Sequence, residues 1–139
     1  MKTLIVEDDF SSRLLLMKLL SPYGEAHPAV NGIEAVEVVR TALEAGEPYN
    51  LICLDLMMPE MDGQTALKHI RVIEESKGLN YGAGAKIIMT TAVNDLGSVA
   101  GAYKSLCDGY LVKPIIKAKL LQELAKLGLL PAPKTAGTF

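Results

Sequence analysis

Residues 51–59 read LICLDLMMP, and this stretch decides the fold of the chain. Its first four residues are all apolar, without the alternation of a strand that has one face in water. A continuous apolar run of this length is typical of a strand in a parallel sheet, which helices cover on both faces. An acid, Asp55, follows the run directly. The stretch therefore predicts a buried strand with a carboxylate at its carboxyl end.

Similar apolar runs recur along the chain and alternate with stretches of helical character. Three continuous runs occupy residues 4–6, 87–89 and 110–112, and a weaker segment, residues 25–30, contains Pro28. Apolar residues recur at helical spacing over residues 11–20, 31–45, 64–76, 94–106 and 116–127. This alternation predicts an α/β fold with a doubly wound, five-stranded parallel sheet. Because proline has no N–H for a sheet ladder, the segment with Pro28 is expected at an edge.

Length and composition narrow the class of protein. The chain has 139 residues, half of them apolar and 22% charged, which fits one globular domain. We expect that domain over residues 1–128 and a flexible tail over residues 129–139. A net charge of −2 gives no basic excess for a nucleic-acid backbone, and no apolar run is long enough for a membrane span. We therefore expect a cytoplasmic protein that binds neither nucleic acid nor membrane.

Reactive side chains gather at the predicted carboxyl ends of the strands, where sites form in open α/β sheets. They are Glu7, Asp8, Asp9, Asp55, Thr90, Thr91 and Lys113. Crowded carboxylates repel one another unless a positive charge intervenes, and Mg²⁺ prefers carboxylate and carbonyl oxygens. Together with the lysine, such a site suits a phosphoryl group. Asp55 is then a metal ligand or the acceptor of the phosphoryl group as an acyl phosphate, and the two roles are compatible.

Four motifs lie at the predicted strand ends: Ile5-Val6-Glu7-Asp8; Asp55-Leu56-Met57-Met58-Pro59 with Asp62-Gly63; Thr91-Ala92; and Gly109-Tyr110-Leu111-Val112-Lys113-Pro114. They resemble the motifs of the receiver domains of two-component response regulators. All four occur in order, each at a strand end, and the resemblance covers residues 2 to about 127. It implies a flavodoxin-like sheet of strand order 2-1-3-4-5, with the second strand at an edge. It also implies a cis peptide bond between Lys113 and Pro114.

The resemblance assigns a role to each residue of the expected site. Asp55 is the expected phosphoacceptor, and Lys113 is the cation that contacts the phosphoryl group. The expected ligands of Mg²⁺ (or Mn²⁺) are the acid pair Glu7 and Asp8, together with Asp55. The backbone carbonyl of Met57 is expected to complete this set.

Two further residues are implied to form a conformational switch. Thr91 is the hydroxyl that moves toward the phosphoryl group, and Tyr110 is the aromatic side chain whose rotamer follows it. From the residues alone, Thr90 competes with Thr91, and Tyr110 also fits an ordinary place in the core. Thr91 is favoured because it directly precedes Ala92.

Three consecutive acids cannot all face one site, so the acid pair has two alternatives. Asp8 belongs to both pairs, and its partner is either Glu7 or Asp9. Arg13 lies five residues after Asp8, as an arginine of the family commonly does after the metal-binding acid. This spacing favours Glu7 as the partner.

The implied function is that of a stand-alone signalling phosphoacceptor rather than of an enzyme. A sensor histidine kinase or a phosphotransfer protein would donate the phosphoryl group to Asp55 with Mg²⁺ bound. The domain would assist its own phosphorylation and dephosphorylation. An output protein would read the phosphorylated state on the face formed by helix 94–106, strand 110–112 and helix 116–127.

Other interpretations fit the residues less well. A haloacid-dehalogenase-type phosphatase needs a second aspartate two residues after the nucleophile, and that position is Met57. A flavodoxin needs a phosphate-binding loop after the first strand, where Glu7, Asp8 and Asp9 would repel phosphate. The main alternative is a receiver fragment of a hybrid kinase or of a multidomain regulator, because the proline-rich tail also suits a linker.

Overall fold

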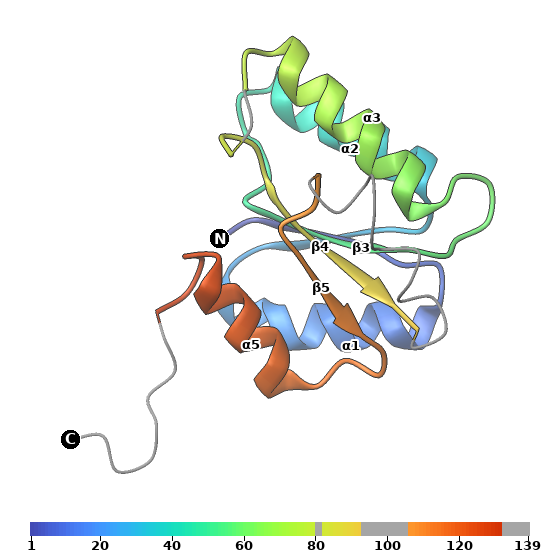
Figure 1. The fold of residues 1–139 in the computed structure, drawn as a ribbon, viewed down its shortest axis with the longest axis vertical. Coiled ribbons are helices and arrows are strands. Elements are labelled where there is room, and N and C mark those ends of the chain that lie inside the picture. The colour runs from blue at the N-terminus through green and yellow to red at the C-terminus, as the bar shows by residue number, and fades with distance from the viewer. Residues whose placement is uncertain (80–81, 93–105, 132–139) are drawn as a thin grey trace.

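The computed structural model describes residues 1–79, 82–92 and 106–131. Five parallel strands form one sheet in the order β2-β1-β3-β4-β5 (Figure 1). The strands are β1 (Thr3–Val6), β2 (Ala26–Ala29), β3 (Leu51–Asp55), β4 (Lys86–Thr91) and β5 (Gly109–Val112). The predicted fold class and strand order are confirmed, and β2, which contains Pro28, lies at an edge.

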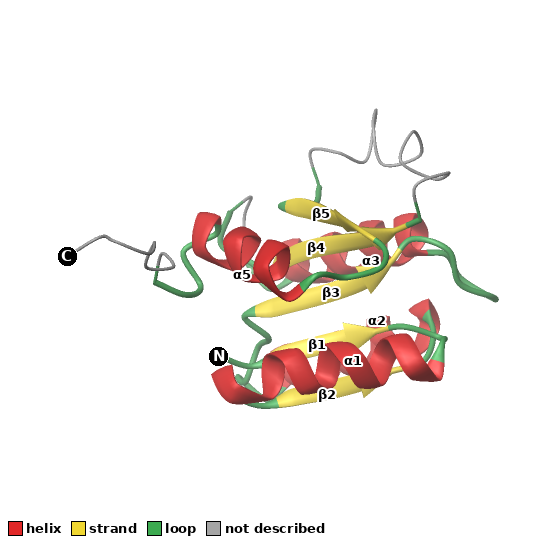
Figure 2. Cartoon of the chain, turned by 90° about the horizontal axis from the view of Figure 1, so that it is seen from below, coloured by secondary structure: helices red, strands yellow, loops and turns green. Residues whose placement is uncertain are grey.

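Helices cover both faces of the sheet. They are α1 (Phe10–Leu20), the short 3-10 helix η1 (Ser21–Tyr23), α2 (Gly32–Glu44), α3 (Gly63–Ser76) and α5 (Lys117–Lys126). Figures 1 and 2 show α2 and α3 on one face and α1 and α5 on the other. The predicted helix over residues 94–106 lies outside the described residues, apart from Leu106. No helix in the described part of the chain has both the length and the apolar character needed to cross a bilayer.

Two apolar clusters, one on each face, hold the layers together. Ile52 and Leu54 of β3 belong to the cluster under α2 and α3, whereas Leu51 and Cys53 belong to the cluster under α1 and α5. All four side chains are at most 1% exposed. Because both faces of the strand are buried, the run that they form shows no polar alternation in the sequence.

Side-chain caps fix where three helices begin. The capping residues are Asp9, Asn31 and Asp62, which accept hydrogen bonds from the backbone N–H groups of Ser12, Glu34 and Thr65. Caps of this kind each stabilise a helix by about 1 kcal/mol. Since each cap also ends the loop that follows a strand, it sets the path of the chain at the carboxyl edge of the sheet.

The chain continues to pack against the sheet beyond α5. The backbone N–H of Leu129 donates to the carbonyl of Leu124 at 2.9 Å. Leu129 and Leu130 pack against the cluster under α1 and α5. These two residues fall in the predicted tail, yet they extend the packed part of the domain. Residues 132–139 lie outside the described part of the chain.

Candidate functional site

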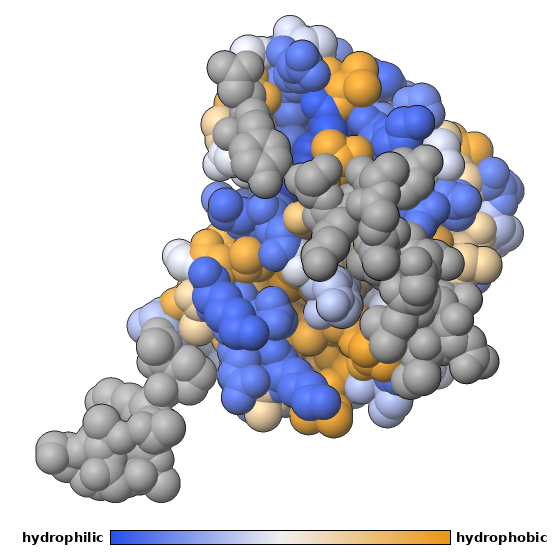
Figure 3. Space-filling view, in the orientation of Figure 1, coloured by the Kyte–Doolittle hydropathy of each residue, from blue (hydrophilic) through white to orange (hydrophobic). Residues whose placement is uncertain are grey.

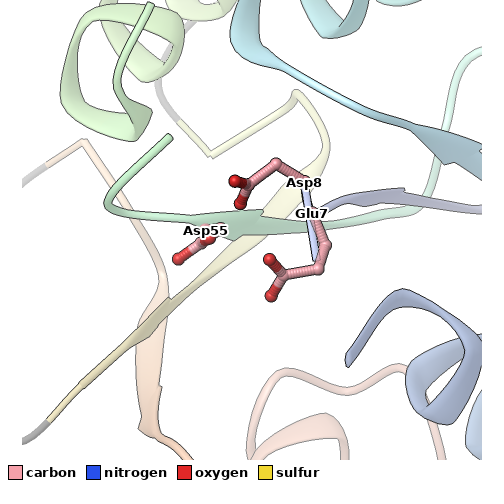
Figure 4. Close-up of side chains that lie close together, drawn as sticks. All are labelled: Glu7, Asp8 and Asp55. Carbon is pink, nitrogen blue, oxygen red and sulfur yellow. The ribbon is translucent and has the colours of Figure 1, made fainter. Parts of the chain in front are cut away.

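Three acids from two neighbouring strands meet at the carboxyl edge of the sheet. Asp55 is the last residue of β3, and Glu7 directly follows β1. The two strands pair so that Val6 lies beside Leu54, which brings the acids next to each other. One carboxylate oxygen from each of Glu7, Asp8 and Asp55 lies within 4.8 Å of the other two (Figure 4). The structure thus brings together the acids that the strand ends were expected to deliver.

The third acid of the run, Asp9, has a different place. Its carboxylate accepts hydrogen bonds from the hydroxyl of Ser12 at 2.8 Å and from the backbone N–H of Ser12 at 2.9 Å. These hydrogen bonds lower the pKa of Asp9 because they favour its charged form. The geometry therefore groups Asp8 with Glu7, and Asp9 with the start of α1.

The surroundings of Asp55 make its carboxylate costly to charge. Glu7 is fully buried and Asp55 is only 4% exposed, whereas Asp8 is exposed. Burial raises the pKa of Asp55 to about 7, and the hydrogen bond and negative charge of Glu7 act in the same direction. A cation bound at these oxygens would favour the charged form of Asp55, so protons and metal ions compete for this edge.

Lys113, which follows β5, supplies a positive charge to the site. Its Nζ lies 2.6 Å from Oε1 of Glu7 and 3.3 Å from Oδ1 of Asp55. Burial alone would lower the pKa of Lys113, but its hydrogen bonds and ion pairs with the two carboxylates outweigh that effect and raise it. The peptide bond between Lys113 and Pro114 is cis, as predicted. The site thus places one ammonium beside three acids, a group that could hold a metal ion.

The two expected switch residues lie on neighbouring strands. Thr91, the last residue of β4, is buried, and its hydroxyl donates to the carbonyl of Ala92 at 3.1 Å. Thr90, its competitor, is also buried and lies in register with Asp55 of β3. Tyr110 of β5 is 44% exposed and does not occupy the core. A change in the rotamer of Tyr110 would therefore alter the surface of the domain.

A close approach of α3 shapes the loop after β3. The backbone N–H of Met57 lies 3.4 Å from Oδ1 of Asp55, while the side chain of Met57 is exposed. The backbone N–H of Gly63 donates to the carbonyl of Leu56 at 2.8 Å. A Cβ at position 63 would lie 2.2 Å from the carbonyl oxygen of Asp55, so only glycine fits there. The sequence signal was the Asp62-Gly63 pair, but this packing role was not predicted from it.

The donor set of the site fits a hard divalent cation. The metal-ligating group found among the described residues consists of the carboxylates of Glu7, Asp8 and Asp55. Mg²⁺ and Mn²⁺ prefer oxygen ligands of this kind, whereas Zn²⁺ sites usually include sulfur or imidazole nitrogen. These residues therefore fit Mg²⁺ better than a softer metal.

The sequence as a whole matches one family. The family model described as "Response regulator receiver domain" matches residues 3–125. The chain belongs to this receiver domain family. Chemotaxis protein CheY of Bacillus subtilis is 31% identical over 130 residues, which cover 90% of this chain and 95% of that protein. By contrast, the chain spans only 3–17% of the length of the sensory and histidine kinase proteins that it matches over 83–93% of its own residues.

Solved receiver structures resemble this domain closely. The receiver domain of sensor histidine kinase PA1611 from Pseudomonas aeruginosa, crystallised with a magnesium ion in its active site cleft, has a TM-score of 0.73 and 26% identity, covering 91% of this chain and 97% of that chain. A co-crystal structure from Saccharomyces cerevisiae joins the phosphotransfer protein Ypd1 and the receiver domain of its response regulator Ssk1. It matches with a TM-score of 0.77 and 29% identity, covering 98% and 94% of the two chains. These likenesses confirm a two-component receiver domain.

Proposed function

We propose that this receiver domain accepts a phosphoryl group on Asp55 from the phosphohistidine of a sensor histidine kinase or of a phosphotransfer protein, with Mg²⁺ bound. The proposal is carried by the position of the Asp55 carboxylate. It lies within 4.8 Å of the carboxylates of Glu7 and Asp8, and 3.3 Å from the ammonium of Lys113. Charge of both signs around one carboxylate suits the transfer of a negatively charged group.

The proposed metal ligands are Asp8, Asp55 and the backbone carbonyl of Met57, with Glu7 completing the acid pair. Their oxygen donors suit Mg²⁺, and Mn²⁺ would serve as a substitute. When bound, the ion would neutralise charge on the transferred phosphoryl group and orient it. The magnesium ion in the active site cleft of the PA1611 receiver domain supports this choice of metal.

In the proposed transfer, Asp55 is the nucleophile. One of its carboxylate oxygens forms the new O–P bond while the P–N bond to the donor imidazole breaks. The electron pair of the broken bond stays on the imidazole nitrogen, which takes up a proton. Lys113 places its ammonium beside the phosphoryl oxygens and stabilises their negative charge. Its present contact of 2.6 Å with Glu7 holds the ammonium next to the acceptor.

Phosphorylation would be read on the β5 side of the domain. The hydroxyl of Thr91 would leave the carbonyl of Ala92 for the phosphoryl group, and Tyr110 would turn toward the core. The proposed output face includes β5 and α5, and its third element, helix 94–106, lies outside the described residues. Figure 3 shows hydrophilic surface along α5 with apolar surface beside it. An output protein shifts the equilibrium between the phosphorylated and unphosphorylated conformations only as far as its affinities for the two conformations differ.

The chain belongs to a signalling family and not to a class of conventional enzymes. Its part in its own phosphorylation and dephosphorylation belongs to this proposal. So do a cytoplasmic location and the absence of nucleic-acid and membrane partners. A net charge of −2 supports the absence of nucleic-acid partners, because it gives no basic excess for a nucleic-acid backbone.

Intact mass spectrometry after incubation with Mg²⁺ and a small acyl phosphate tests the proposal. The wild type is expected to gain the mass of one phosphoryl group, and base is expected to remove that group more readily than acid. The Asp55→Asn variant is expected to gain nothing. Asp62→Asn makes the same change at an exposed helix cap, where asparagine caps as well as aspartate, and should be phosphorylated normally. An acid-stable, base-labile phosphate on Asp55→Asn would refute the assignment.

A further inference from the structure

Arg13 reaches back from α1 to the turn that carries the metal-binding acids. Its Nη1 donates to the carbonyl of Glu7 at 2.8 Å and lies 3.4 Å from the carbonyl of Asp8. The strand ladder of β1 ends at Val6, so these carbonyls lie beyond the sheet that orders the residues before them. Glu7 is buried, and a buried backbone carbonyl needs a hydrogen-bond donor, which here is the side chain of Arg13.

One further contact holds the guanidinium in this place, and a second fixes the backbone of Arg13. Its central carbon lies 5.6 Å from the ring centroid of Phe10, a cation–π distance. The backbone N–H of Arg13 donates to the carbonyl of Asp9 at 2.9 Å, within the turn that the Asp9 side chain caps. Phe10 is 67% exposed, so the guanidinium gives this aromatic side chain a role other than core packing.

We infer that Arg13 is a positioning residue of the site: it fixes the backbone of Glu7 and Asp8 so that their carboxylates face Asp55. The inference rests on the proposed metal role of these acids. Arg13 itself touches neither the metal nor the phosphoryl group in this scheme. It acts through the backbone carbonyls of Glu7 and Asp8, because the orientation of this backbone sets the direction of the two side chains.

Charge and positioning predict opposite effects when Arg13 is removed. The guanidinium contacts the backbone of two of the proposed ligands, and its positive charge opposes the binding of Mg²⁺ there, so loss of its charge alone would tighten Mg²⁺ binding. Loss of the two carbonyl contacts would loosen the turn and weaken Mg²⁺ binding. Removal of residues that orient metal ligands typically costs 10–100-fold in metal affinity. The sign of the change therefore separates the two effects.

Isothermal titration of Mg²⁺ into the metal-free chain tests the inference. The Arg13→Ala variant is expected to bind Mg²⁺ about tenfold more weakly than the wild type. Lys18→Ala removes the same charge from an exposed position on the same helix and should change the affinity less than about twofold. Phosphorylation of Arg13→Ala is expected to be slow at low Mg²⁺ and to recover at saturating Mg²⁺.

The Arg13→Lys variant guards against a folding defect. It keeps the positive charge but loses the planar fork, and it is expected to weaken Mg²⁺ binding about threefold with little change in stability. Unchanged or tighter Mg²⁺ binding by both variants would overturn the inference, and so would a wild type that binds no Mg²⁺. Because this titration needs no phosphoryl transfer, phosphorylation of Asp55→Asn would refute the proposed acceptor without touching this result.

Discussion

Two charged clusters at opposite ends of the sheet share one arrangement, in which a cation lies between two acids. At the amino end, Arg71 pairs with Glu74 at 2.7 Å and with Asp108 at 2.9 Å, and Nζ of Lys86 lies 4.0 Å from Asp108. At the carboxyl end, Lys113 pairs with Glu7 at 2.6 Å and with Asp55 at 3.3 Å. Their surroundings differ. The first cluster is closed by backbone groups, whereas the second adds a third, exposed acid.

Backbone groups supply further hydrogen-bond partners to the side chains of the Arg71 cluster. Arg71 also donates to the carbonyls of Leu106 and Ala85, each at 2.8 Å. The acids accept from the backbone N–H groups of Ala85 at 2.7 Å and Ile87 at 2.8 Å. A cavity of about 270 Å³ borders this cluster. A third acid, rather than a cavity, distinguishes the end of the sheet at which we propose the site.

The largest expected effect is a loss of stability when the Arg71 cluster is disrupted. Arg71→Ala should lower the free energy of unfolding by about 3 kcal/mol, because it leaves the buried Glu74 without its cation and Asp108 with Lys86 alone. Urea denaturation measures this loss. Arg40→Ala, which removes an exposed arginine paired with Glu37, is the matched control and should cost less than about 0.5 kcal/mol. A loss below about 1 kcal/mol for Arg71→Ala would show that the Arg71 cluster contributes little to folding.

At the carboxyl end of the sheet, removal of a charged group is expected to raise stability rather than lower it. Burial raises the pKa of Asp55 from 3.8 to about 7, so the folded state holds this proton more tightly than the unfolded state. Without metal, this group makes the wild type lose stability as the pH rises from about 4 to 7, and the loss is complete above pH 7.

The Asp55→Asn variant lacks this group and should be more stable than the wild type by on the order of 2 kcal/mol at pH 8 in EDTA. The difference should shrink toward pH 4. Paired urea denaturation curves across this range measure it. Destabilisation of Asp55→Asn at pH 8 would mean that the carboxylate is already balanced, as the acids beside Arg71 are.

The smallest expected effect is the stabilisation of the folded protein by Mg²⁺ at the proposed site. Mg²⁺ at ten times its Kd should stabilise the wild type by about 1.4 kcal/mol. Met57→Ala should show the same gain, because the expected ligand at this position is a backbone carbonyl and the side chain is exposed. Thermal denaturation with and without Mg²⁺ compares the two proteins. A smaller gain for Met57→Ala would assign a role to the side chain instead.

Prediction from the sequence worked best where one local rule sufficed. Continuous apolar runs indicated buried parallel strands, and Pro28 indicated the edge position of β2. The Arg71 cluster was not predicted, since Asp108 lies 37 residues from Arg71 and only the fold brings them together.

The sequence by itself determined the order of strands and helices and the residues that end each strand, because apolar periodicity and helix caps act over a few neighbouring positions. Tertiary structure decided which acids share the site. Asp9 caps α1 and therefore lies outside the acid cluster, while the pairing of β1 with β3 places Glu7 beside Asp55. It also decided that Gly63 must lack a side chain, since that limit comes from the carbonyl of Asp55 across the loop. Contacts of this kind depend on distances in space, which the spacing of residues along the chain does not contain.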